Sequence, residues 1–181
     1  MKLDKIEDEL SLPAGATVHV NGSTLVVKGP KGELSREIPK GIVVQPSVDA
    51  VLVSVKDATK REKTTVFTFS AHLKSMLKGV SLGHAYTLKI CSGHFPMNVS
   101  VKGNVFEIKN FIGESVPRRM PVMAGADIKI EGDKITVTGI DKQVVSQVAA
   151  GIEQLTRRPG FDERIFQDGI YLTDKDGKKL G

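Results

Sequence analysis

Alternating apolar and polar residues around a glycine mark two short stretches of the chain as β-hairpins. In the first stretch apolar residues flank Gly22 with a period of two, and a less regular version of the same pattern flanks Gly103. This period places one set of side chains on one face of a strand, and glycine supplies the positive φ that tight hairpin turns need. The apolar positions are Val18, Val20, Leu25 and Val27, and then Val99, Val101, Val105 and Ile108.

The two hairpins belong to an internal repeat. Residues 18–33 (VHVNGSTLVVKGPKGE) align with residues 99–114 (VSVKGNVFEIKNFIGE). After a small insertion the match resumes between 49–53 (DAVLV) and 133–137 (DKITV), and a stretch with helical spacing follows in both halves. Self-similarity at a fixed spacing indicates two copies of one supersecondary unit.

Two segments carry apolar residues at helical spacing. The first is predicted to be a helix over 60–78 that Gly79 ends, and the second a helix over 141–156 that Asp141 caps. The expected buried faces consist of Phe69, Leu73, Met76 and Leu77 in the first helix, and of Val144, Val145, Val148, Ile152 and Leu155 in the second.

Each half therefore combines a few strands with one helix. We predict an α+β fold of two tandem copies of one small unit, each a mostly antiparallel β-sheet packed on one α-helix. The first domain is expected to span 1–81 and the second 82–181. Beyond Arg157 the chain is polar and glycine-rich apart from a short strand predicted at 170–172, so we expect an extended, charged tail that is partly disordered without a partner.

Composition adds a mild bias towards a polyanionic partner. The 181 residues include 26 Lys and Arg against 21 Asp and Glu, which gives a net charge of +5. Basic side chains release counterions when they bind phosphates, although many proteins with this balance bind no nucleic acid. Cys91 is the single cysteine, which excludes an internal disulfide, and no apolar run approaches the ~20 residues of a membrane span. We expect a soluble, cytoplasmic protein with no membrane partner.

No pattern in the sequence indicates catalysis. The GPKGE segment at 29–33 lacks the spacing of a phosphate loop and leads into no helix. Aspartates that recur between the repeats are explained by turns and helix caps. The histidines have no metal-site spacing, so we expect exposed positions for them and predict no catalytic residue, cofactor, metal ion or small-molecule substrate. They are His19, His72, His84 and His94.

Positive charge gathers in the second half of the chain. Arginine offers a planar fork for phosphate oxygens and lysine a mobile point charge. A solvated surface is the alternative, because five acidic residues also lie beyond Arg158. The basic residues are Arg118 and Arg119, expected in a loop, Arg157 and Arg158 after the second helix, and Arg164, Lys175, Lys178 and Lys179 in the tail.

Aromatic residues accompany this charge. Phe161, Phe166 and Tyr171 could stack on nucleobases, or could pin the tail to the domain. Pinning is favoured for Tyr171, because it lies in an apolar run.

Four longer motifs carry a resemblance to a known family. They are KGVSLGHAYTLKI at 78–90, NFIGESVPRR at 110–119, VTGIDKQVVSQVAAGIEQ at 137–154 and RIFQDGIYL at 164–172. In this order they resemble the archaeal and eukaryotic branch of the large-subunit ribosomal protein L-six family, over nearly the whole chain. The resemblance implies a duplicated fold without catalytic activity.

The resemblance also implies binding to large-subunit rRNA, near the sarcin–ricin loop and the base of the factor-binding stalk, beside neighbouring ribosomal proteins. Phe161 stands where the family often has a lysine, which removes one expected phosphate contact. The RNA contacts that we predict on this basis are Arg118, Arg119, Arg157, Arg158, Arg164, Lys175, Lys178 and Lys179, with Gly169 and Tyr171 shaping the tail.

A structural component of the ribosome is therefore the first hypothesis, and two alternatives stay open. An enzyme acting on a phosphorylated substrate would use the aspartates and the Arg118-Arg119 pair, but it needs a convergent polar cluster that the sequence does not show. A protein–protein adaptor would use exposed sheet edges, and its basic charge would be incidental.

Overall fold

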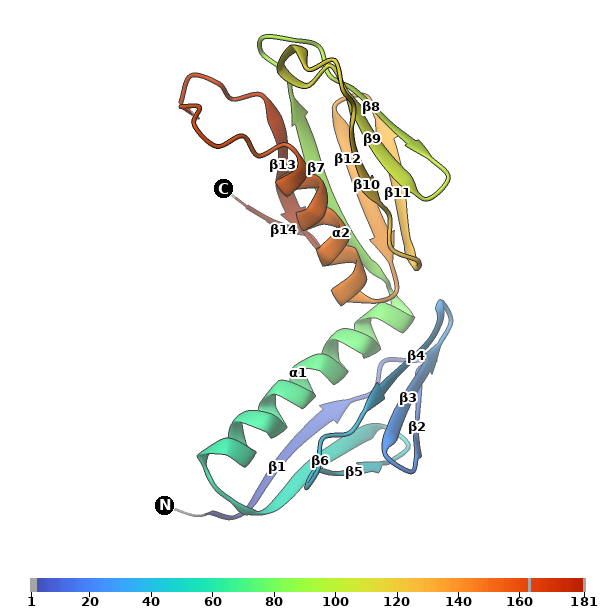
Figure 1. Ribbon diagram of the computed structural model, residues 1–181. Helices are drawn as coiled ribbons and strands as arrows, with labels where there is room; N and C mark the ends of the chain where they lie inside the picture. The colour runs from blue at the N-terminus through green and yellow to red at the C-terminus, as the bar shows by residue number, and fades with distance from the viewer. Residues whose placement is uncertain (1–2, 163, 181) are drawn as a thin grey trace. The chain divides into compact units, whose positions relative to one another are not determined.

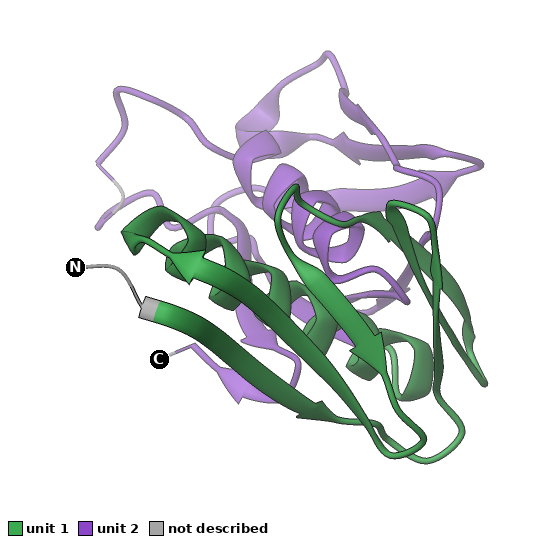
Figure 2. Ribbon diagram, turned by 90° about the horizontal axis from the view of Figure 1, so that it is seen from below, with its two compact units in different colours: residues 1–83 green, residues 84–181 purple. Residues whose placement is uncertain are grey.

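The computed structural model describes residues 3–162 and 164–180. The chain divides into two compact units, residues 1–83 and residues 84–181, which are coloured green and purple in Figure 2. Within the described residues each unit consists of one α-helix and two antiparallel β-sheets. No described helix is long and apolar enough to cross a membrane.

Unit 1 packs helix α1 (Lys60–Ser81) against two three-stranded sheets, with the strand orders β1-β6-β5 and β2-β3-β4. Its core is formed by buried valine and leucine side chains of the strands and by the apolar face predicted for the helix. The strands are β1 (Leu3–Ser11), β2 (Thr17–Asn21), β3 (Thr24–Gly29), β4 (Gly32–Glu37), β5 (Val43–Pro46) and β6 (Ala50–Ala58).

Unit 2 packs helix α2 (Lys142–Leu155) against a five-stranded sheet with the order β11-β12-β7-β13-β14 (Figure 1). A second sheet has the order β10-β9-β8, and a 3-10 turn spans Phe111–Gly113. The strands are β7 (His84–Cys91), β8 (Asn98–Lys102), β9 (Val105–Lys109), β10 (Arg118–Pro121), β11 (Ala126–Glu131), β12 (Lys134–Gly139), β13 (Gly169–Lys175) and β14 (Lys178–Lys179).

The two units repeat one topology, which confirms the predicted duplicated α+β fold. The sheet β1-β6-β5 corresponds to β7-β12-β11, the sheet β2-β3-β4 corresponds to β8-β9-β10, and α1 corresponds to α2. Both predicted hairpins turn at a glycine with positive φ, 61° at Gly22 and 57° at Gly103. Unit 2 differs by the addition of β13 and β14 beside β7.

Of the two helix ends predicted from the sequence, the start of α2 is confirmed and the end of α1 is not. Helix α2 has the predicted N-cap, because the Asp141 carboxylate accepts the Gln143 N–H at 2.8 Å. Helix α1 does not end at Gly79, as the sequence suggested. It continues to Ser81 because Val80 packs fully buried into the core. The residue that ends it is Gly83, whose φ of +79° lets its N–H bond to the Lys78 carbonyl at 3.1 Å.

The short strand predicted at 170–172 is present within β13, but residues 169–180 as a whole do not form the extended tail that the sequence suggested. Strand β13 pairs antiparallel with β7, and Ile170 is fully buried in the core. Asp176 and Gly177 form a two-residue turn with φ of 55° and 86°, after which β14 pairs back onto β13. An Asp-Gly pair with two positive φ values favours this type of hairpin, and it is the sequence signal that could have identified these strands.

Candidate nucleic-acid interface

A pocket of about 320 Å³ lies between the C-terminal end of α2 and the described residues 157–162 and 164–168, which precede β13. Figure 1 shows these residues as irregular backbone beside α2, and they are called the pocket segment here. The pocket brings together three of the predicted RNA-binding residues, Arg157, Arg158 and Tyr171. The other lining residues are Ile112, Glu153, Gln154, Thr156, Phe161, Phe166 and Asp168.

Aromatic and arginine side chains stack along one wall of this pocket. The Arg158 guanidinium carbon lies 4.1 Å from the centroid of the Phe161 ring. Phe161 meets Phe166 edge-on with centroids 5.0 Å apart, and Phe166 lies 5.1 Å from the His94 ring. Phe166 thus pins the segment to the domain, whereas Phe161 and Tyr171 are 37% and 41% exposed. The sequence favoured pinning for Tyr171, whose ring lies over Gly169, and its fully buried neighbour Ile170 also holds this strand in the core.

Polar side chains at the C-terminal end of α2, one in its last turn and one at its C-cap, cover the edge of β13 next to the pocket. The Thr156 hydroxyl accepts the Ile170 N–H at 3.0 Å, and the Glu153 carboxylate accepts the Leu172 N–H at 3.0 Å. Gly169 is buried on the same strand, and a Cβ there would meet the Tyr171 ring at 3.0 Å. The absence of a side chain at 169 therefore leaves room for the Tyr171 ring to lie over the backbone.

Arg118 lies in strand β10 rather than in the predicted loop, and its guanidinium is used inside the unit. It forms a two-point ion pair with Glu114, with N–O distances of 2.7 and 2.6 Å, and lies 4.3 Å from the Phe111 ring centroid. Its Nη1 donates to the Leu155 carbonyl at 2.7 Å and to the Arg157 carbonyl at 3.3 Å. The hydrogen bond from Arg118 holds the pKa of Glu114 below its usual range. Arg118 thus caps the end of α2 beneath the pocket.

Arg119 extends from the same strand with a more exposed side chain. It is 64% exposed, and its Nε donates to Glu107 Oε2 at 2.8 Å. Glu107 is buried, and its second oxygen lies 3.4 Å from Lys109 Nζ. The hydrogen bond from Arg119 is the main cause of the lowered pKa of Glu107. Arg119 does not line the pocket, so any contact it makes with RNA belongs to a separate surface.

Asp168 anchors the end of the pocket segment to the loop after β7. Its two carboxylate oxygens accept the His94 N–H at 3.0 Å and approach His94 Nδ1 at 2.5 Å. Burial by itself would raise the pKa of Asp168, but the hydrogen bonds from His94 lower this pKa below its usual range. The folded structure therefore stabilises the ionised form of the Asp168 carboxyl group.

This lowered pKa predicts a loss of stability in acid. A carboxylate whose folded pKa lies below its unfolded value, near about 4, stabilises the fold above that value and stops doing so as the pH falls through the folded pKa. We expect the urea midpoint of the protein to exceed that of Asp168→Asn at pH 7, and the gap to close below about pH 4. A gap that is constant down to pH 3 would contradict this assignment.

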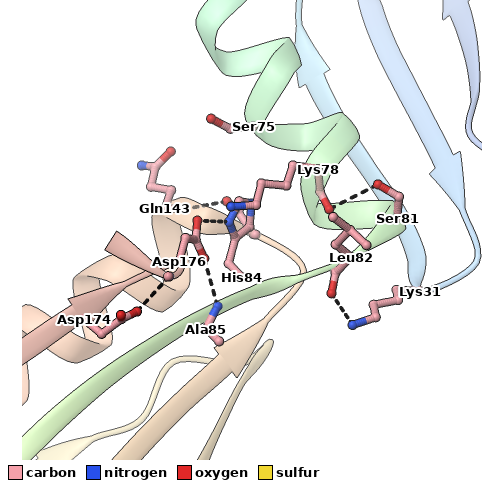
Figure 3. Close-up of polar contacts among 12 residues, drawn as sticks. Lys31, Ser75, Lys78, Ser81, Leu82, His84, Ala85, Gln143, Asp174 and Asp176 are labelled. Atoms are coloured by element: carbon pink, nitrogen blue, oxygen red, sulfur yellow. Dashed lines mark hydrogen bonds and ion pairs between the residues drawn. The ribbon is translucent and has the colours of Figure 1, made fainter. Parts of the chain in front are cut away.

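The histidines follow the prediction in part. His19 is exposed as expected, but His84 is buried, with its Nδ1 2.7 Å from Asp176 Oδ2. The other Asp176 oxygen accepts the Ala85 N–H at 2.9 Å, as Figure 3 shows. This partner lies 92 residues away in sequence, and only the pairing of β13 with β7 brings it near. Within residues 3–162 and 164–180, no three His, Cys, Asp or Glu side chains gather as metal ligands.

The remaining predicted residues lie outside the pocket lining. Arg164 is on the pocket segment, 90% exposed, and paired with Asp162 at 2.9 Å. Lys175, Lys178 and Lys179 are exposed around the β13–β14 hairpin. Lys175 is roughly 13 Å along the strand from Tyr171, at about 3.3 Å per residue. The predicted set therefore splits into a pocket group, a hairpin group and the β10 arginines.

Several pocket residues were missing from the predicted set, among them Glu153 and Gln154. Both are polar residues in the last turn of α2, and the sequence shows them only as part of a solvated helix face. Together the pocket offers guanidinium groups for phosphate, aromatic surface for stacking, and carboxylate and amide groups for hydrogen bonding. This combination suits a nucleic acid better than a small anion.

Comparison with known proteins gives the same family for both units. The family described as Ribosomal protein L6 matches residues 12–83 and 95–169. The chain is 43% identical over 176 residues to Large ribosomal subunit protein uL6 of Methanococcus vannielii, with 97% of each chain covered. It is 42% identical over 177 residues to the protein of the same name from Methanocella arvoryzae, with 97% of this chain and 99% of that one covered.

A third relative, from Methanospirillum hungatei, also carries that name and is 39% identical over 171 residues, covering 94% of this chain and 97% of its own length. The family match therefore falls on both copies of the duplicated fold, and the relatives align from end to end. On these grounds the chain belongs to the Ribosomal protein L6 family.

Proposed function

We propose that this chain is a non-catalytic structural component of the large ribosomal subunit, and that it binds large-subunit rRNA through the pocket at the end of α2. Its relatives are named as proteins of that subunit. As a ribosomal component it works in the cytoplasm, with rRNA and neighbouring large-subunit proteins as partners. The observation that carries RNA binding is the gathering of Arg157, Arg158, Phe161 and Tyr171 around one pocket.

The electrostatics of the helix end support this proposal. The C-terminus of a helix carries a partial negative charge on its unpaired carbonyls, which would repel phosphate. Arg118 donates to two carbonyls at this end, those of Leu155 and Arg157. With that charge offset, the Arg157 and Arg158 side chains can offer positive charge to phosphates beside the Glu153 and Asp168 carboxylates. Arg118 and Gly169 thereby act as supports for the RNA-binding residues.

The predicted residues outside the pocket form further contact surfaces in this proposal. Arg164 extends the pocket group, and its ion pair with Asp162 is exposed enough to exchange for a phosphate. Lys175, Lys178 and Lys179 offer point charges to a second RNA segment, and Arg119 offers a third contact. On the family resemblance we propose that the bound RNA lies near the sarcin–ricin loop and the factor-binding stalk, where the protein would support docking of translational GTPases.

Binding of the full chain to an rRNA fragment that contains the sarcin–ricin region, over a salt series, tests the proposal. We expect the affinity to fall with salt, and the triple variant Arg157→Ala, Arg158→Ala, Arg164→Ala to bind more weakly with a shallower slope. Each phosphate contact contributes about 0.7–0.9 to the slope of log K against log salt, so the slope should fall by roughly two.

Arg61→Ala is the matched control, because Arg61 is an exposed arginine on α1 in the other unit. This variant should bind like the unmodified chain. Equal affinity of the triple variant and the control would move RNA binding away from the pocket. Salt-independent binding, or none, would contradict the RNA-binding role itself.

The adaptor alternative needs a sheet edge with unpaired backbone groups. At β13 the Ile170 and Leu172 N–H groups already bond to Thr156 and Glu153. An incoming strand would have to displace both side chains, so this edge does not favour strand addition.

A further inference from the structure

We infer that the pocket at the end of α2 receives a single unpaired nucleobase of the bound RNA, with the adjoining phosphates held at the rim by Arg157 and Arg158. This inference rests on the proposed RNA-binding function and deepens it. It distinguishes a site that grips one extruded base from a surface that merely neutralises the phosphate backbone.

The dimensions of the pocket fit one nucleotide. Its volume of about 320 Å³ is at the lower end of small-molecule sites, which span about 300–1,000 Å³. An RNA duplex cannot enter a cavity of this size. A base that is splayed out of a loop or bulge can enter, and single-stranded bases of this kind are what proteins read in RNA.

The walls of the pocket provide stacking surfaces. The Arg158 guanidinium lies over the Phe161 ring, so the two form a layered platform whose planar cation can take a base on its outer face. The Phe161–Phe166–His94 ring contacts hold this platform against the domain. Tyr171, held over Gly169, supplies a second aromatic surface.

The polar groups in the pocket favour a base over a phosphate. Two carboxylates line it, Glu153 and Asp168, and a phosphate inside the pocket would be repelled by both. A base instead presents N–H donors, which a carboxylate accepts, and Gln154 can both donate and accept. The Asp168 oxygens are already directed at His94, and Glu153 Oε1 accepts the Leu172 N–H, so Glu153 Oε2 and the Gln154 amide are the groups that contact the base edge.

The test uses three RNA hairpins that differ at one position: a single-nucleotide bulge, the same bulge with an abasic sugar, and no bulge. All three keep the same stem phosphates, so the backbone contribution is nearly constant. We expect the full-length protein to bind the bulged hairpin roughly tenfold more tightly than the abasic one, because stacking of one base contributes on that scale. Each of the four bases is tried at the bulge.

Phe161→Ala and Glu153→Gln are the test variants, and Phe95→Ala is the matched control. Phe95 is a similarly exposed phenylalanine of the same unit, 44% exposed, and it does not line the pocket. Phe161→Ala should reduce the tenfold preference to about one, and Phe95→Ala should keep the preference. Glu153→Gln should change the order of preference among the four bases.

The outcomes distinguish a failure of the base pocket from a failure of RNA binding as a whole. Equal binding of all three hairpins by the unmodified protein would overturn the base pocket and leave RNA binding intact. A preference that survives in Phe161→Ala would also overturn it, since the base would then be held elsewhere. Failure to bind any hairpin or the sarcin–ricin fragment would contradict the proposed function itself.

Discussion

Replacing Arg118 with Ala is expected to lower the free energy of unfolding by about 2–3 kcal/mol, since the loss leaves several partly buried partners unpaired at once. Glu114 loses both of its hydrogen bonds, and the Leu155 and Arg157 carbonyls lose a donor. The Phe111 ring also loses the guanidinium stacked on it. We expect a smaller loss of stability than for a fully buried ion pair, because the Arg118 and Glu114 side chains are 22% and 29% exposed.

Urea unfolding of three variants measures this effect. Arg118→Ala should be the least stable, Arg118→Lys should recover part of the loss through its single charge, and Arg118→Ala with Glu114→Gln should be more stable than Arg118→Ala alone. The last comparison removes the unpaired carboxylate without restoring the arginine. A loss below about 0.5 kcal/mol, as is usual for a surface substitution, would show that Arg118 is no structural support.

The same variant connects stability to RNA binding. Since Arg118 offsets the negative end of α2 and does not line the pocket, its loss should weaken RNA binding without a change in base preference. A direct phosphate contact by Arg118, as the sequence predicted, would instead lower the salt slope by about one at unchanged protein stability.

Gly139→Ala is expected to destabilise the protein by about 3 kcal/mol through overpacking. A Cβ at Gly139 would lie 2.5 Å from the Gly125 carbonyl oxygen and 2.7 Å from Val145 Cγ2. The first is backbone and the second belongs to a fully buried side chain, so neither can move away without shifting β12 or α2. The change should therefore lower the urea midpoint strongly.

Gly151→Ala provides the matched comparison within the same unit. Its Cβ would meet Met120 Sδ at 2.6 Å, but this atom is near the far end of a flexible side chain. Alanine also has a better helix propensity than glycine by about 1 kcal/mol, which offsets the adjustment of Met120. We expect a net effect near zero. Similar losses in both variants would show that backbone contact is not the deciding factor.

The RNA-binding set was predicted in outline, and its geometry was not. The sequence pointed to the basic residues of the second half, and Arg157, Arg158 and Tyr171 do line one pocket. The role of Arg118 could not be read from the chain, because its carbonyl partners lie 37 and 39 residues away. Direct RNA contact by the predicted set, and a domain boundary after residue 81, stay predictions.

The sequence by itself determined the duplicated α+β fold, the Gly22 and Gly103 hairpins and the capped helix α2. These features depend on residues close together in sequence, where the spacing of apolar residues and the turn-forming residues can be recognised directly. Only the tertiary structure decided that residues 169–180 join the sheet, that α1 continues past Gly79, and that His84 is buried beside Asp176. In each case burial against residues distant in sequence outweighed a local preference for loop, helix end or solvent, because removal of apolar surface from water depends on the assembled fold.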